Sequence, residues 1–191
     1  MKFVVSMFFL VLPMMVDAAP SDPMPGYRET LQHELDNRAV ARHVVPVMAS
    51  MYKGRPAGEF WEAYQALENA QAPLYGEYGQ CHGLVASGFV PWIKAKTSIV
   101  FAWLMPGRFV SLLSGATQRY LAELEQVLVP GQERDRAFWR YVVAQERAQV
   151  QALALAADDK HAEAAQILKG FRDSVLPVAM KHGACEEDPS S

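Results

Sequence analysis

Cysteine, strand-forming patterns and an excess of one charge are all scarce in this sequence of 191 residues. Only two cysteines occur, which excludes a scaffold held by several disulfides. Alternation of apolar and polar residues is hard to find and no Asn-Gly or Asp-Gly hairpin turn is present, which argues against a β-sheet protein. The net charge is −3 and no basic patch is long enough to follow phosphates, so we expect no binding to nucleic acid.

Catalytic motifs are also absent. The sequence has no Gly-x-Ser-x-Gly nucleophile turn, no His-Glu-x-x-His zinc helix and no Cys-x-x-Cys-His haem site. A glycine-rich phosphate loop needs a preceding strand, and no strand is predicted. These absences favour a protein that is not an enzyme but leave that question open, and no cofactor is predicted.

The N-terminus, in contrast, carries a clear pattern. Lys2 precedes an apolar run over residues 3–16, and Val16 and Ala18 provide small residues at the −3 and −1 positions of a cleavage site. This order predicts a secretory signal peptide over residues 1–18 and a periplasmic or secreted protein. The run is shorter than the about 20 residues of a membrane helix, so we expect no membrane span after its removal.

Between its ends the chain predicts one helical domain over residues 27–185. Alanine, leucine, glutamine, glutamate and arginine dominate there, and these residues favour helices. Residues 19–26 contain three prolines and predict an extended leader, and residues 186–191 predict a flexible tail. The predicted fold is all-α: a compact single-domain array of about five to seven helices, with one disulfide.

Proline and glycine residues indicate where the predicted helices end. Helices are expected over residues 27–53, 59–72, 108–129, 132–157 and 158–181, with short helical pieces within the apolar stretch 84–113. Pro73 is expected to end the second helix, which leaves residues 74–83, rich in glycine and tyrosine, as an irregular segment.

Cys81 and Cys185 are predicted to form a disulfide, because paired cysteines in an exported protein are usually bonded. An alternative follows from their neighbours. His82 and His182 would be brought together with the two thiols, and this set could hold zinc, or copper when reduced. The adjacent positions of Cys81 and His82 are poor chelating geometry, so the disulfide is the preferred interpretation.

A partner surface is predicted in the segment 74–80. Tyr75 and Tyr78 alternate with glycines there, and Glu77 lies between them. Rigid aromatic side chains on an adaptable backbone are typical of recognition loops, so Tyr75, Glu77 and Tyr78 are the predicted partner-binding residues. The competing interpretation is that both tyrosines cover the edge of the core.

Glu146 lies on the apolar face of its predicted helix, between Val143 and Val150. A carboxylate in that position must pair, become neutral or reach solvent. Arg38 and Arg42 lie on a similar face of the first helix, so a buried ion pair between helices is expected. Glu146 is also the one weak candidate for a catalytic acid or base.

Three functions remain. The first is an exported protein-binding module, such as an inhibitor or immunity-type protein that neutralises another exported protein. The second is a metal-binding or redox protein that uses the two Cys-His pairs. The third is a helical enzyme or small-ligand carrier with a Glu/Arg site in its core, and a solvent-connected cavity at Glu146 would favour it.

Overall fold

The computed structural model describes residues 26–86, 99, 105–129 and 132–180, and all the regular structure in these ranges is helical. The helices are α2 (Tyr27–Met51), α3 (Pro56–Cys81), α5 (Pro106–Leu124), α6 (Glu133–Ala157), α7 (His161–Ser174) and the short α8 (Leu176–Met180). The predicted all-α array is confirmed. The predicted signal peptide, most of the leader and the tail lie outside the described residues.

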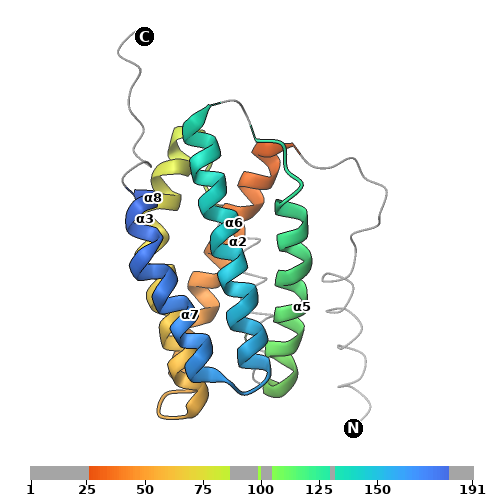
Figure 1. Cartoon of the computed structure of the whole chain (residues 1–191), viewed down its shortest axis with the longest axis vertical. Coiled ribbons are helices and arrows are strands. Elements are labelled where there is room, and N and C mark those ends of the chain that lie inside the picture. Colours follow the sequence, from red (N-terminus) through yellow and green to blue (C-terminus); the bar gives the residue numbers. More distant parts are fainter. Residues whose placement is uncertain (1–25, 87–98, 100–104, 130–131, 181–191) are drawn as a thin grey trace.

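The helices form an elongated bundle (Figure 1). α2 packs against α3, α3 against α7, α7 against α6, and α6 against α5. α2 and α6 run in one direction, whereas α3, α5 and α7 run in the other (Figure 1). α5 is therefore held chiefly by α6, and the bundle is least tightly closed between α5 and α2.

Turn chemistry explains where the helices begin and reverse. α3 and α5 both have proline in the first turn, where the missing N–H has no partner to lose. Gly54, with φ of 74°, reverses the chain between α2 and α3. Asp159, with φ of 59°, does so between α6 and α7, and aspartate is one of the few residues that tolerate this conformation. These short connections make the joined helices antiparallel neighbours.

Large apolar side chains from four helices meet in the core. Those with at most 1% exposure include Leu31, Met48, Phe60, Trp61, Leu67, Leu153 and Leu168. Each such side chain contributes about 1.5–3 kcal/mol through its burial. This burial, rather than helix propensity alone, holds helices of this length together.

The predicted end of the second helix at Pro73 is wrong, because α3 continues through Pro73 to Cys81. A proline inside a helix costs about 3 kcal/mol. Beyond it, however, Leu74, Tyr75 and Tyr78 are all at most 2% exposed. Burial of these three side chains offsets the local cost, so the expected irregular segment is helical.

Other boundaries agree more closely. α6 matches the prediction for residues 132–157, and α5 begins and ends somewhat earlier than expected. The last predicted helix is divided, since α7 ends at Ser174 and α8 follows after Val175.

The central apolar stretch 84–113 is only partly described, and the short helical pieces expected within it lie mostly outside the described residues. Its last part forms the start of α5. Within the ranges that the structure covers, no helix combines the length and the apolar character needed to cross a membrane.

Candidate functional site

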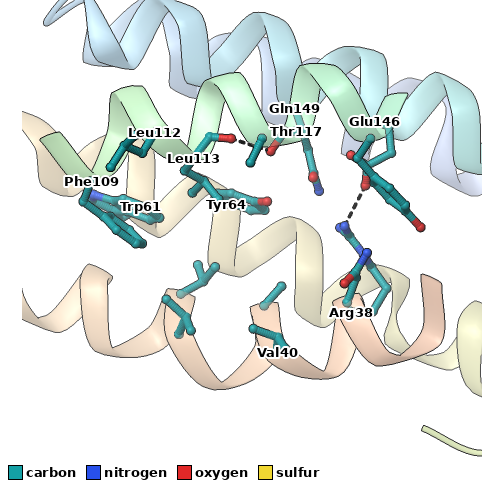
Figure 2. A pocket seen from close by; sticks show the side chains of 16 residues that line it. Arg38, Val40, Trp61, Tyr64, Phe109, Leu112, Leu113, Thr117, Glu146 and Gln149 are labelled. Atoms are coloured by element: carbon teal, nitrogen blue, oxygen red, sulfur yellow. Dashed lines mark hydrogen bonds and ion pairs between the residues drawn. The ribbon is translucent and has the colours of Figure 1, made fainter. Parts of the chain in front are cut away.

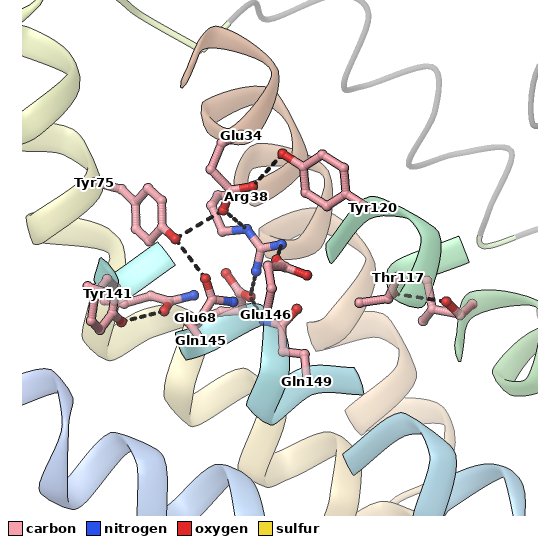
Figure 3. Close-up of polar contacts among 12 residues, drawn as sticks. Glu34, Arg38, Glu68, Tyr75, Thr117, Tyr120, Tyr141, Gln145, Glu146 and Gln149 are labelled. Carbon is pink, nitrogen blue, oxygen red and sulfur yellow. Dashed lines mark hydrogen bonds and ion pairs between the residues drawn. The ribbon is translucent and has the colours of Figure 1, made fainter. Parts of the chain in front are cut away.

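A charged cluster lies in the middle of the bundle (Figure 3). Arg38 from α2 is surrounded by three carboxylates, and we call these four residues the central cluster: Glu34, Arg38, Glu68 and Glu146. The Arg38 Nε lies 3.1 Å from Glu34 Oε1, Nη1 lies 2.9 Å from Glu68 Oε1, and Nη2 lies 2.6 Å from Glu146 Oε1. The four side chains are 0–6% exposed, so three helices are joined by fully buried ion pairs.

Phenols and amides surround the central cluster. Tyr120 of α5 donates a hydrogen bond to Glu34 Oε2 at 2.8 Å. The Tyr75 hydroxyl lies 2.7 Å from Gln145 Oε1 and 3.0 Å from Glu34 Oε1. Gln149 donates to Glu68 Oε1 at 3.3 Å. Tyr120 thus satisfies the second oxygen of Glu34, whereas Tyr75 and Gln149 bind oxygens that Arg38 also contacts.

The charges of the central cluster do not balance, because three carboxylates share one cation. Burial raises the pKa of Glu146 to about 8, although Arg38 acts to lower it. Burial likewise raises the pKa of Glu68 against the effect of Arg38. Burial alone would lower the pKa of Arg38, but the surrounding carboxylates, Glu34 above all, raise it well above its usual value. At neutral pH the arginine is charged and Glu146 holds a proton.

A cavity of about 240 Å³ begins at this cluster and runs between α2, α3, α5 and α6 (Figure 2). Arg38 and Glu146 lie at one end of the cavity, and Trp61 and Phe109 lie at the other. The remaining lining residues are Asn37, Val40, Ala41, Val44, Val45, Tyr64, Leu112, Leu113, Ala116, Thr117, Tyr120 and Gln149. Leu112, which is 55% exposed, and the exposed Ala116 connect the cavity to solvent.

Tyr64 spans the middle of this cavity. Its ring is parallel to that of Trp61, with an angle of 4° and centroids 6.1 Å apart, and its hydroxyl points towards the polar end (Figure 2). The residue is 6% exposed. No side chain or carbonyl among the described residues hydrogen-bonds to the Tyr64 hydroxyl, whereas buried phenols usually have a partner.

A second polar cluster lies at the end of the bundle where α2 begins and α3 ends. This end cluster consists of Tyr27, Tyr78, His82 and Asp135. The Tyr27 and Tyr78 hydroxyls are 2.6 Å apart, Tyr78 donates to Asp135 Oδ1, and His82 Nε2 lies 3.2 Å from the same oxygen. Burial raises the pKa of Tyr27 to about 12, so both phenols remain neutral donors. None of these residues lines the cavity described above.

The predicted partner-binding segment is corrected by these contacts. Tyr75 and Tyr78 are 1% and 0% exposed and take part in the two polar clusters, so neither ring is available to a partner. Of the three predicted residues only Glu77 is exposed. The competing interpretation, in which the tyrosines belong to the core, is the one that the structure favours.

The structure describes only two of the four residues in the cysteine and histidine predictions, Cys81 and His82. Cys81 lies in the last turn of α3, whereas Cys185 and His182 lie outside the described residues, so the disulfide stays a prediction. His82 contacts Asp135. Within the described ranges, no group of three or more histidine, cysteine or acidic side chains is arranged to hold a metal ion.

The expected ion pair of Glu146 is confirmed, with Arg38 as its partner. Sequence reasoning missed Glu34 and Glu68, which are as deeply buried. A signal for Glu34 existed, because it precedes Arg38 by one helical turn, a spacing that favours an ion pair.

Comparisons of the chain with protein-family models, curated proteins and solved structures give no match. The site therefore has to be interpreted from its own geometry.

Proposed function

We propose that this protein binds a small amphipathic molecule in the cavity between α2, α3, α5 and α6. The observation that supports this most directly is the shape of the lining: aromatic and aliphatic walls lead from exposed Leu112 and Ala116 to the buried pair of Arg38 and Glu146. Apolar walls with a few convergent polar groups are the usual design of small-molecule sites. This corresponds to the small-ligand carrier among the three functions expected from the sequence.

The volume limits the size of the ligand. An apolar cavity of about 150 Å³ accommodates benzene, so about 240 Å³ suits a molecule of about ten non-hydrogen atoms. For ligands of this size we expect dissociation constants in the micromolar range or weaker.

Two other expectations stay proposals. The N-terminal pattern supports export, and a disulfide between Cys81 and Cys185 would then tie the end of α3 to the C-terminal segment. The ligand would accordingly be one found outside the cytoplasm. Binding to another exported protein is the less favoured proposal, because its predicted contact residues Tyr75 and Tyr78 are buried.

The test is a titration of the full chain with 2-phenylethanol, a neutral probe of suitable size, by isothermal calorimetry. Ala116→Phe places a ring at the exposed mouth of the cavity, and we expect it to weaken binding by about tenfold or more. Ala122→Phe is the matched control, because Ala122 is exposed on the same helix and does not line the cavity. Equal affinity in the two variants, or no binding to the wild type, contradicts the proposal.

A further inference from the structure

The charges around the cavity distinguish between an anionic, a neutral and a cationic ligand. Among the described lining residues, Arg38 carries a positive charge, and Glu146 becomes negatively charged when it loses its proton. Each of the three guanidinium nitrogens of Arg38 already lies within 3.1 Å of a carboxylate oxygen. An anionic ligand at this guanidinium would lie beside three buried acidic side chains, and its repulsion by those that are ionised is strongly unfavourable in a low-dielectric interior.

Glu146 is in the opposite situation. Its Oε1 accepts from Arg38 at 2.6 Å, and no hydrogen bond from the described residues reaches Oε2. The residue is 1% exposed and lines the cavity, so the accessible side of this carboxyl group faces the ligand space. A buried carboxylate with one oxygen unoccupied is completed by a cationic hydrogen-bond donor.

The walls of the cavity suit the same kind of ligand. Trp61 stacks with Tyr64 and with Phe109, whose centroid lies 6.3 Å from that of Trp61. Aromatic faces attract organic cations and also pack against an apolar body. The Tyr64 hydroxyl, which has no partner among the described residues, points to the same end as Glu146 and can accept a second N–H (Figure 2).

Resting on the proposed function, we propose that the ligand is a small organic cation: a primary ammonium group on an apolar body of about eight carbon atoms. Its N–H groups donate to Glu146 Oε2 and to the Tyr64 hydroxyl, and its apolar body lies between Trp61 and the aliphatic side chains of α2 and α5. The ammonium ion supplies the second positive charge that the three carboxylates of the central cluster lack.

The pH dependence follows from the groups around Glu146. Those that face it are Arg38 and Glu34 from α2, Glu68, Tyr64 and Tyr75 from α3, and Tyr120 from α5. Because the pKa of Glu146 is about 8 in the empty cavity, the ammonium ion replaces a proton when it binds near neutral pH. Affinity for the cation should therefore rise with pH from about 6 to 8, by at most about tenfold per pH unit.

The experiment compares three probes with the same body and different polar groups: 2-phenylethylamine, 2-phenylethanol and phenylacetate. The full chain is titrated with each at pH 8, where the amine is protonated because its pKa is close to that of lysine, about 10.4. We expect the ammonium ion to bind at least about tenfold more tightly than the alcohol, and phenylacetate to bind most weakly.

Two variants test whether Glu146 and Tyr64 are the residues that prefer the ammonium ion over the alcohol. Glu146→Gln should reduce the affinity for the ammonium ion to that for the alcohol, abolish its pH dependence and leave binding of the alcohol almost unchanged. Tyr64→Phe should weaken the binding of the ammonium ion and leave the binding of the alcohol unchanged. This second variant keeps the test valid should Glu146→Gln fold poorly. Glu125→Gln, at an exposed ion pair with Arg147, is the control that should change nothing.

The outcomes separate this inference from the proposed function. If the alcohol or phenylacetate binds as tightly as the ammonium ion and Ala116→Phe removes that binding, the cavity is a ligand site but the cationic ligand is wrong. If none of the three probes binds, both proposals are wrong. If the ammonium ion is preferred equally in wild type and in both variants, Glu146 and Tyr64 do not recognise it, and the inference is overturned.

Discussion

The central cluster and the end cluster both join helices α2, α3 and α6 through buried polar side chains, but they differ in the balance of their charges and in their surroundings. In the end cluster the one carboxylate, Asp135, accepts a hydrogen bond from the Tyr78 hydroxyl and contacts the imidazole of His82. In the central cluster three carboxylates share one guanidinium and a cavity lies beside them. The first arrangement is complete in itself, whereas the second has more acceptor capacity than the described residues fill.

The comparison teaches how to distinguish a structural polar cluster from a binding site in a core. Both clusters are buried, so burial does not decide between them. The ring of Tyr78 stacks on Phe138 with centroids 3.7 Å apart, and its hydroxyl has partners on two helices. The ring of Tyr64 also stacks, but its hydroxyl faces open space. A polar group with both a cavity and an unmet hydrogen bond is the better indicator of a ligand.

The largest effect is expected from removing the cation of the central cluster. Arg38→Met removes the one cation among the three buried acidic side chains of the central cluster and should lower the free energy of unfolding by about 3–5 kcal/mol. Urea denaturation at pH 7 measures it. Arg147→Met is the control, because its pair with Glu125 is exposed and should contribute less than about 1 kcal/mol. Equal costs in the two variants would mean that the cluster is hydrated rather than buried.

The next effect is the dependence of the free energy of unfolding on pH, which tests the excess of acidic groups in the central cluster. The pKa of Glu146 is about 8 in the folded protein and about 4.5 in the unfolded chain, so the folded state binds more protons in between. Its contribution to stability is fully present below about pH 4.5 and is lost as pH rises to about 8, with a slope of at most about 1.4 kcal/mol per pH unit. Glu146→Gln should flatten this slope in urea unfolding curves, and Glu125→Gln should leave it unchanged.

The sequence predicted the fold class and two members of the central cluster, Arg38 and Glu146, for clear physical reasons. Helix-forming residues and the lack of strand patterns determine the all-α class. Glu146 was recognisable because a carboxylate interrupts an apolar helical stripe. Glu68 was not, because it adjoins a core leucine at the border of its helix face, where a charged side chain can equally reach solvent. Glu34 was missed, although its spacing of one helical turn from Arg38 favours an ion pair.

Two features could not be predicted from local rules. At Pro73 the rule that proline ends a helix was outweighed by the burial of Tyr75 and Tyr78, which only the packed structure reveals. The cavity depends on how closely α5 approaches α2, and residues far apart in the sequence determine that distance. Recognising the site therefore required the packing of side chains between helices.

The smallest effects come from removing a single hydroxyl, and they compare the two clusters most directly. Tyr78→Phe removes the donor to Asp135 and should lower the free energy of unfolding by about 1–3 kcal/mol, without changing the affinity for 2-phenylethylamine. Tyr64→Phe breaks no hydrogen bond among the described residues, so its stability should stay within about 0.5 kcal/mol of wild type while its affinity for the ammonium ion falls. Thermal unfolding and calorimetry on the same two samples measure both quantities. The reverse result, with Tyr64 needed for stability and Tyr78 for binding, would move the ligand site from the central cluster to the end cluster.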